Sequence, residues 1–308
     1  MLKIENDYIL KFYRNINLSN LTTYKIGGKS LGVFIVNNTF DLIKVLLYLS
    51  QKGIPYKIIG KGSNLLITDE YLIEKVFIIN KERYFINYEN KVLVNAGLEL
   101  QYFIKKLIEL NFDSYQELAG IPASVGGSVF NNAGIPSIEI SKYISTIYIF
   151  NRQKRKIEII KINDKNRSQF FSYRNSFFKE EANNNLFYDI LYIEFEFKTK
   201  KNKEELLNIY NNTWKKRLSS QPLNIPSCGS VFKNIYFNDK ILRAWEIIDN
   251  LGFRGYTYNG AKVSEKHPNF IINFNNAKFK DVYHIIQTIQ SKAKSNNYNL
   301  DLEVEIIK

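Results

Sequence analysis

The chain has 308 residues, of which 45% are hydrophobic, and its 43 Lys and Arg against 30 Asp and Glu give a net charge of +13. This length favours two domains, and 22 Phe with 21 Tyr supply enough core to exclude intrinsic disorder. The single cysteine, Cys228, excludes a disulfide scaffold and indicates a reducing compartment. No apolar run approaches the roughly 18 residues of a membrane span, and Glu5 and Asp7 interrupt the N-terminus, unlike a signal peptide. We therefore expect a cytoplasmic protein without membrane insertion.

The first third of the chain alternates strands and helices. A strand over residues 32–36 precedes a helix over 39–52 with Thr39 as N-cap, and a second strand follows over 56–59. The glycine turn at 60–64 then stands at the end of a strand, where α/β folds commonly bind ligands. Its N–H groups can cradle a phosphate, but a tight turn explains it equally well, because neither GxGxxG nor GK[ST] is complete.

The middle of the chain contains a long run of small residues, AGIPASVGGSVFNNAG, at 119–134. Small residues let the backbone lie flat against a large ligand, so the run favours ligand binding over a plain loop. A helix is predicted before it at 98–111. The strands predicted around it lie at 91–95, 143–150, 156–162 and 188–197.

The last third begins after a charged stretch at 198–205, which marks the best domain boundary. The elements predicted beyond it are helices at 204–218, 240–251 and 280–294 and strands at 230–233, 270–273 and 300–307. No internal repeat is visible, so the pattern indicates an α+β protein of two domains.

Few residues stand out as reactive. Arg174, amid small polar residues, is either a surface charge or a donor to an anion. Ser230 follows a glycine at a predicted strand, but no G-x-S-x-G motif is present, so a Ser–His–acid hydrolase is weakly supported. One cysteine and two histidines make a zinc site poorer still, and His267, in a polar loop, is the better ligand contact of the two. Glu303 lies on the polar face of the last strand, which solvent alone explains.

Several motifs occur in a characteristic order: NLTTY at 20–24, IGKGSNLL at 59–66, LAGIP at 118–122, VGG at 125–127, NAG at 132–134, YRNS at 173–176, QPL at 221–223, PSCGSVFKN at 226–234, VSEKH at 263–267 and LEV at 302–304. Together they resemble the UDP-N-acetylenolpyruvoylglucosamine reductase family over nearly the whole chain. The QPL and PSCGS motifs are similar to those of the second type of this family.

The resemblance implies the FAD-binding fold of the vanillyl-alcohol-oxidase type, followed by a smaller α+β substrate domain. We expect an FAD-binding domain at 1–200 and a substrate-binding domain at 201–308, with the final strand at 300–308 returning to the first domain. The implied activity is that of an oxidoreductase of peptidoglycan synthesis, in which NADPH reduces FAD and the flavin reduces the enolpyruvyl group of a nucleotide sugar.

The resemblance also assigns roles to single residues. Ser230 is the expected proton donor, Arg174 the cation for the substrate carboxylate and Glu303 the assisting acid. Substrate contacts are expected at Lys233, Asn234 and His267. Non-covalent FAD contacts are expected at Gly60, Gly62, Ser63, Asn64, Gly120, Ile121, Pro122, Gly126, Gly127, Ala133 and Gly134. No metal is implied.

Some positions depart from the family pattern. Asn131 stands where a hydrophobic residue is common, Asn259 where a glycine is common and Ile235 where a proline is common, and the run Ile135-Pro136-Ser137 replaces Ala-Tyr-Gly. These changes concern affinity more than the type of reaction.

Two alternatives remain at the level of sequence. The first is another FAD-linked oxidoreductase of the same fold, which has no reason to retain Arg174, Ser230 and Glu303 together. The second is a nucleotide- or RNA-binding protein, which the basic charge suggests. The lysines are scattered along the chain, so we expect no nucleic-acid partner. The resemblance implies a small nucleotide-sugar ligand, and we expect a monomer.

Overall fold

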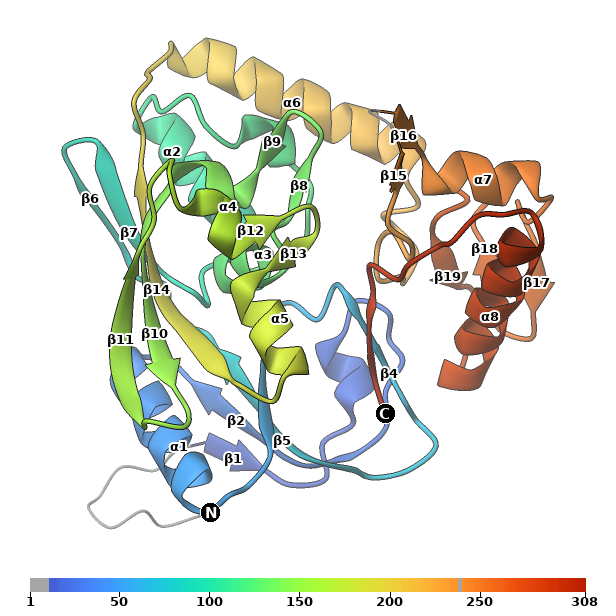
Figure 1. Cartoon of the computed structure of the whole chain (residues 1–308), viewed down its shortest axis with the longest axis horizontal. Coiled ribbons are helices and arrows are strands. Elements are labelled where there is room, and N and C mark those ends of the chain that lie inside the picture. The colour runs from blue at the N-terminus through green and yellow to red at the C-terminus, as the bar shows by residue number, and fades with distance from the viewer. Residues whose placement is uncertain (1–10, 238–239) are drawn as a thin grey trace. The chain divides into compact units, whose positions relative to one another are not determined.

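The computed structural model describes residues 11–237 and 240–308 (Figure 1). The helices are α1 (Thr39–Gln51), α2 (Leu100–Glu109), α3 (Val125–Phe130), α4 (Arg167–Phe170), α5 (Phe177–Asn183), α6 (Lys203–Ser220), α7 (Ala244–Asn250) and α8 (Phe279–Ser295). Short 3-10 helices are η1 (Leu18–Leu21), η2 (Gln116–Leu118) and η3 (Ile140–Tyr143).

The chain forms two compact units that interleave along the sequence. Unit 1 contains Gly32–Lys61 and Glu74–Lys215 with the described residues up to Arg14. Unit 2 contains Asn15–Leu31, Gly62–Ile73 and Lys216–Lys308. The single boundary expected near residue 200 therefore does not describe the compact units.

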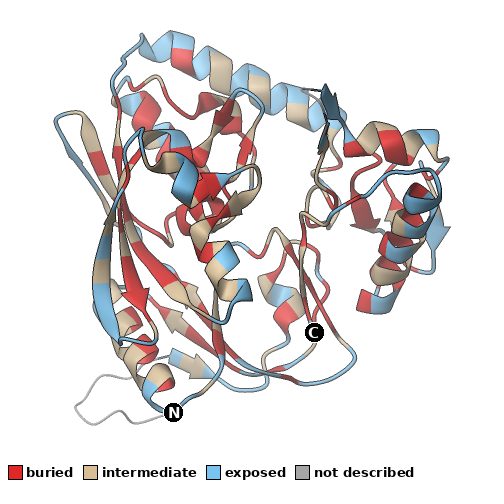
Figure 2. Cartoon of the chain, viewed as in Figure 1, coloured by how far each residue is buried: buried red, intermediate tan, exposed pale blue. Residues whose placement is uncertain are grey.

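Unit 1 is built around a five-stranded antiparallel sheet. Its strands, in spatial order, are β11 (Lys156–Lys161), β10 (Ile144–Asn151), β14 (Tyr188–Glu196), β7 (Lys91–Asn95) and β6 (Phe85–Tyr88). Helices α2 and α3 place apolar residues in the same cluster as Ile147, Ile193 and Phe195 of the sheet. Ile193 and Phe195 of β14 are fully buried, and Glu194 between them is also buried, with 8% of its surface exposed, so buried residues run along this strand in Figure 2.

Unit 1 also contains a four-stranded sheet covered by α1. Its strands, in spatial order, are β1 (Lys11–Tyr13), β2 (Ser30–Val36), β5 (Ile73–Asn80) and β3 (Tyr56–Ile59). The N-cap of this helix is Asn38, one residue before the predicted Thr39, because the Asn38 side chain accepts from the N–H of Asp41 at 2.8 Å. Thr39 instead donates its hydroxyl to Glu82.

Unit 2 combines the C-terminal residues with two earlier segments. A sheet of β17 (Thr257–Tyr258), β18 (Ala261–Val263) and β19 (Ile271–Asn273) shares an apolar cluster with α7 and α8. Tyr24 and Leu66 are buried in the same cluster, and the Tyr24 hydroxyl donates to the Ile271 carbonyl at 2.7 Å. The last strand, β20 (Glu305–Ile307), pairs in parallel with β4 (Leu65–Ile67). These contacts explain why segments so distant in sequence belong to one unit.

Three expected elements of the last third differ most from their predicted bounds. The strand at 230–233 is a single bridge between Phe232 and Leu302, and the last strand forms only from Glu305. The helix expected at 240–251 starts at Ala244, because Ile241 and Leu242 pair with β15 (Ile235–Phe237) to form β16 (Lys240–Leu242). Their apolar side chains match a helical pattern but lie exposed on this hairpin.

Candidate active site

The small-residue run at 119–134, which we call the cradle segment, contains a helix rather than a flat loop. Helix α3 begins after Ser124, whose hydroxyl oxygen accepts from the N–H of Gly127 at 3.1 Å. The same hydroxyl lies where a side chain at Gly60 would stand, because an ideal Cβ there would be 2.2 Å from it. Ser124 therefore brings Gly60 and the cradle segment together. Sequence reasoning missed this role, although a serine before VGG is a typical N-cap.

Gly126 is required by packing within unit 1. Its N–H donates to the Ala96 carbonyl at 2.8 Å, and an ideal Cβ would lie 2.7 Å from the Ala96 Cβ. The glycine thus allows α3 to touch the chain just after β7. Gly134 is similar, since its ideal Cβ would lie 2.5 Å from the carbonyl oxygen of Ile138 in the hairpin of β8 (Gly134–Ile135) and β9 (Ile138–Glu139).

Gly127 differs from its neighbour. An ideal Cβ there would meet only the Ser124 hydroxyl, at 3.1 Å, within the described residues. This side of α3 is consequently open to a ligand.

The start of the cradle segment is held by Gln101 of α2. Its side chain accepts from the N–H of Gly120 at 3.0 Å and donates to the Ile121 carbonyl at 3.0 Å. Gly120 has φ +84°, a left-handed conformation that favours glycine. Pro122 is exposed, and Ala133, at the far end, donates its N–H to Ser128 at 2.8 Å.

The turn at 60–64 carries the chain from unit 1 to unit 2. Gly62 has φ +62°, and its ideal Cβ would lie 2.2 Å from the Leu21 carbonyl, so a side chain is excluded. Among the described residues, no hydrogen bond uses the backbone N–H of Lys61 or Ser63, which leaves both donors for a ligand. Asn64 donates its side-chain amide to the Glu303 carbonyl at 3.1 Å.

Arg174 lies in unit 1, at the turn between β12 (Phe171–Ser172) and β13 (Asn175–Ser176). Its backbone is left-handed, with φ +53°, and its guanidinium donates to the Gly134 carbonyl at 2.7 Å. Burial raises the pKa of Glu139, and a hydrogen bond from Asn132 and the charge of Arg174 oppose that rise. The predicted arginine is therefore anchored at the end of the cradle segment.

The chain segments that carry Ser230 and Glu303 lie side by side and antiparallel in unit 2. The bridge between Phe232 and Leu302 sets the register, and the Glu303 N–H donates to the Val231 carbonyl at 2.8 Å. Burial and the nearby charge of Glu303 raise the pKa of Cys228, two residues before Ser230, to about 12. Residues 230–233 are called the serine segment below.

The predicted substrate contacts flank the serine segment. Lys233 donates its N–H to Asp301 at 2.8 Å, and the Asn234 side chain accepts from the N–H of Ala244 at 3.0 Å, which starts α7. The His267 ring packs edge-on against Phe270 with centroids 4.9 Å apart. Burial lowers the pKa of His267 to about 4, and its Nδ1 has no hydrogen-bond partner among the described residues.

Local contacts or backbone conformation explain some of the residues that depart from the family pattern. Asn131 donates to the Gly127 carbonyl and accepts from Lys179, each at 3.1 Å. Asn259 adopts φ +46° and donates to Asp281 at 2.9 Å, because asparagine tolerates the left-handed conformation that glycine favours. Ile135 pairs with Ile138 in the β8–β9 hairpin. Nothing in the structure explains Ile235.

Within residues 11–237 and 240–308, no group of three or more His, Cys, Asp and Glu side chains is placed to hold a metal ion. None of the helices formed by the described residues has the length and apolarity needed to cross a bilayer.

Comparisons with known proteins cover both units. Residues 221–307 match the family model described as UDP-N-acetylenolpyruvoylglucosamine reductase, C-terminal domain, and residues 30–148 match an FAD binding domain. A UDP-N-acetylenolpyruvoylglucosamine reductase of Fervidobacterium nodosum is 36% identical over 97% of this chain and 92% of its own length. One from Thermotoga maritima is 34% identical over 94% of this chain and 95% of its own.

A solved structure agrees with these matches. The UDP-N-acetylenolpyruvylglucosamine reductase of Thermus caldophilus superposes with a TM-score of 0.78 at 26% identity, covering 97% of this chain and 100% of the other. The FAD-binding match contains Gly60 and the cradle segment, and the reductase match contains Ser230 and Glu303.

Proposed function

The chain belongs to the UDP-N-acetylenolpyruvoylglucosamine reductase family, and we propose that Arg174, Ser230 and Glu303 carry out its chemistry. The resemblance stated from the sequence motifs is thereby confirmed, as is the FAD-binding fold of the vanillyl-alcohol-oxidase type with an α+β substrate domain. The protein is an FAD-dependent oxidoreductase that reduces UDP-N-acetylenolpyruvoylglucosamine in peptidoglycan synthesis.

The residues of this chain fit FAD at the predicted positions. Gly127 leaves one side of α3 open, and the N–H groups of Lys61 and Ser63 are uncommitted donors suited to a pyrophosphate. Neither the turn nor the cradle segment contains His or Cys, so we propose that FAD is held without a covalent bond. When bound, FAD supplies the hydride that reaches C3 of the enolpyruvyl group, and we propose NADPH as the source of that hydride.

Arg174 has the chemistry to hold the substrate carboxylate. Hydride addition at C3 of the enolpyruvyl double bond pushes negative charge toward C2 and the carboxylate. A fixed guanidinium stabilises that charge, because arginine stays protonated and forms two parallel hydrogen bonds to a carboxylate. The bond from Arg174 to Gly134 and the nearby Glu139 fix the guanidinium before substrate arrives.

Ser230 then supplies the proton to C2. Its Oγ–H bond breaks as the C2–H bond forms, and solvent or a neighbouring group restores the hydroxyl proton. An ordinary serine hydroxyl is a weak acid, so a second group must assist, and Glu303 stands on the adjacent segment. This register between residues 230–233 and 301–304 is the observation that carries the assignment.

We test the assignment by separating the two half-reactions in stopped flow. In Ser230→Ala, reduction of the flavin by NADPH should stay within about twofold of wild type, while reoxidation by substrate should slow by about 10²-fold or more. Ser295→Ala, in the exposed last turn of α8, serves as the control. Wild-type reoxidation in Ser230→Ala would remove the serine from the mechanism.

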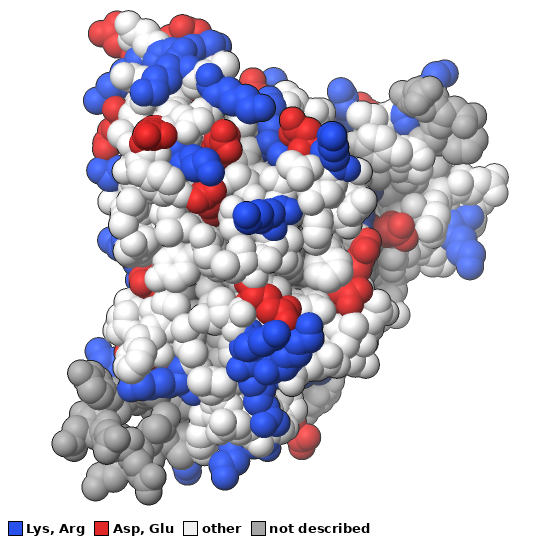
Figure 3. Space-filling view, turned by 60° about the vertical axis from the view of Figure 1, so that its left-hand side comes forward, with Lys and Arg blue, Asp and Glu red and all other residues white. Residues whose placement is uncertain are grey.

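The partner we propose is a small nucleotide sugar in the cytoplasm, acted on by a monomer. The basic charge does not require a nucleic acid, because many lysines pair with carboxylates, as Lys154 does with Glu158 at 3.0 Å. On the face shown in Figure 3, basic and acidic side chains are interspersed. A cofactor-free preparation that binds RNA in physiological salt would instead support the second alternative.

A further inference from the structure

We propose that Asn269 is a positioning residue for the proton transfer, a role that rests on Ser230 being the proton donor proposed above. Asn269 is buried, with 4% of its surface exposed, and lies in the loop that follows His267. It touches the serine segment rather than the place where substrate reacts, and it acts by fixing the backbone that carries Ser230.

The contacts of Asn269 are three hydrogen bonds to two consecutive residues. Its side-chain oxygen accepts from the N–H of Phe232 at 2.9 Å, and its side-chain nitrogen donates to the Phe232 carbonyl at 2.8 Å. Its own carbonyl accepts from the N–H of Val231 at 2.8 Å. One asparagine therefore satisfies most of one backbone edge of the serine segment.

The opposite edge of the serine segment is held by the end of the chain. The Val231 carbonyl accepts from Glu303 at 2.8 Å, and the Lys233 N–H donates to Asp301 at 2.8 Å. The segment is thus fixed between residues 301–303 on one side and Asn269 on the other. Because both edges meet at Val231, next to Ser230, they set where the hydroxyl lies relative to Glu303.

Only an amide side chain serves this purpose at Asn269. Phe232 is 1% exposed, so its N–H and carbonyl have no access to water and need partners within the protein. An amide donates and accepts at once, whereas alanine offers neither and a carboxylate only accepts. Loss of the amide leaves two buried backbone groups unpaired, and the segment must shift to satisfy them.

The test compares Asn269→Ala with Asn273→Ala. Asn273 lies in the same unit and also bonds two backbone groups, donating to the Tyr24 carbonyl at 3.1 Å and accepting from Ala277 at 2.8 Å. Its side chain makes no hydrogen bond to the serine segment within the described residues. Both variants should lose some thermal stability, so stability alone does not separate a positioning role from a structural one.

The readouts are the saturating rate of flavin reoxidation by substrate and its solvent deuterium isotope effect. In Asn269→Ala we expect FAD content and reduction by NADPH as in wild type, reoxidation slower by about 10-fold or more, and a larger isotope effect, because protonation becomes the slow step. Asn273→Ala should match wild type in both readouts.

Wild-type reoxidation and isotope effect in folded Asn269→Ala would overturn the proposal. If that variant does not fold, Asn269→Ser, which keeps a shorter donor and acceptor, decides the question by the same readouts. The two proposals fail separately. If Ser230→Ala reoxidises at the wild-type rate, the proton donor itself is misassigned, whereas slow Ser230→Ala with unaffected Asn269 variants removes only the positioning role.

Discussion

The cradle segment of unit 1 takes its position because its glycines have no side chains and allow close packing. The serine segment of unit 2 takes its position through hydrogen bonds to its backbone. Gly126 sits where any Cβ would overlap Ala96. Around Phe232, by contrast, the backbone is held by hydrogen bonds to the Asn269 side chain. The first region should therefore be sensitive to added atoms and the second to removed hydrogen bonds.

This difference distinguishes glycines that packing within the protein requires from glycines that ligand binding would require. Gly60, Gly62, Gly126 and Gly134 each have protein atoms within 3.0 Å of an ideal Cβ, so the fold alone requires them. At Gly127 the nearest described atom is the Ser124 hydroxyl at 3.1 Å, which needs to shift by only a few tenths of an ångström, so the fold requires this glycine less than the others. A loss of FAD on substitution is informative at Gly127 and ambiguous at Gly126.

The largest effect is expected from the pair Gly126→Val and Gly127→Val. Gly126→Val should lower the free energy of unfolding of the FAD-free protein by about 3 kcal/mol, because overpacking displaces α3 from Ala96. Gly127→Val should leave that stability within about 0.5 kcal/mol and still remove FAD. Denaturant unfolding and the visible spectrum of the purified protein measure the two effects.

Either of two results would break the comparison. Full FAD occupancy in Gly127→Val would show that the open side of α3 is not part of the cofactor site. Equal destabilisation of both variants would show that the contact at Ala96 does not distinguish the two glycines.

The cradle segment was recognisable in the sequence because its signal is local. Many small residues in one stretch indicate close approach without any knowledge of the partner. The sequence could not show which partner each glycine approaches, because Ala96 and Ser124 become neighbours of Gly126 and Gly60 only through the fold. Helix α3 was missed for a related reason, since glycines disfavour a helix and tertiary contacts overrode that preference.

The serine segment was recognised by motif, but its structure was not predicted. Its apolar residues suggested a strand, yet both of its edges are completed from far along the chain, by Asn269 and by residues 301–303. A buried asparagine that pairs with backbone leaves no periodic pattern in the sequence. Asn269 was therefore absent from the predicted site, although its neighbour His267 was included.

The second prediction tests how well the loop around His267 buries its ring from water. In the folded protein its pKa is about 4, below the ordinary 6.5, so the folded state stays neutral while the unfolded state takes up a proton as the pH falls. The contribution of His267 to the free energy of unfolding is therefore fully present above pH 6.5 and is lost as the pH falls toward 4. If the ring were fully buried, the free energy of unfolding would fall by about 3 kcal/mol over this range. Because the ring is partly exposed, we expect a fall of about 2 kcal/mol.

The measurement is the free energy of unfolding of wild type and His267→Gln at several pH values. The difference, wild type minus variant, should fall by about 2 kcal/mol between pH 7 and pH 4. Phe270→Leu trims a neighbour of the same ring but keeps the imidazole, so its difference should change with pH much less than that of His267→Gln. A constant difference for His267→Gln would mean that the ring is hydrated.

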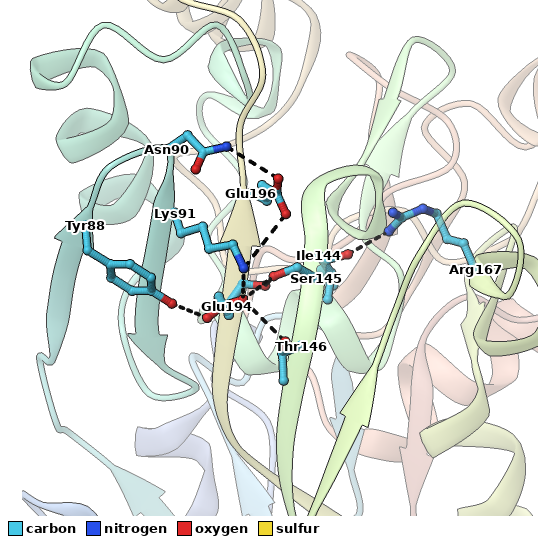
Figure 4. A network of polar contacts seen from close by, with 9 residues as sticks. All are labelled: Tyr88, Asn90, Lys91, Ile144, Ser145, Thr146, Arg167, Glu194 and Glu196. Carbon is cyan, nitrogen blue, oxygen red and sulfur yellow. Dashed lines mark hydrogen bonds and ion pairs between the residues drawn. The ribbon is translucent and has the colours of Figure 1, made fainter.

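The smallest effect concerns a carboxylate of unit 1, shown with its neighbours in Figure 4. Glu194 accepts hydrogen bonds from Tyr88, from Lys91 at 3.1 Å, from Ser145 at 2.7 Å and from Thr146 at 3.3 Å. Burial raises its pKa, but the bonds from Tyr88, Ser145 and Lys91 outweigh burial and leave the pKa below its usual value. Stability from this group is therefore present above about pH 4.5 and is lost as the pH falls below that value.

Glu194→Gln should lower the free energy of unfolding by about 1 kcal/mol at pH 7, because glutamine keeps most of the hydrogen bonds but not their charge. The deficit should shrink as the pH falls below 4.5, because protonation removes the charge of the wild-type carboxylate as well. Glu196→Gln, two residues along the same strand, should change stability by about 0.5 kcal/mol or less, because its contact with Lys91 is long and exposed. Unit 2 would then lose stability between pH 6.5 and 4 through His267, and unit 1 only at lower pH through Glu194. A Glu194→Gln deficit that persists unchanged at pH 3 would mean that packing rather than charge holds this part of the sheet.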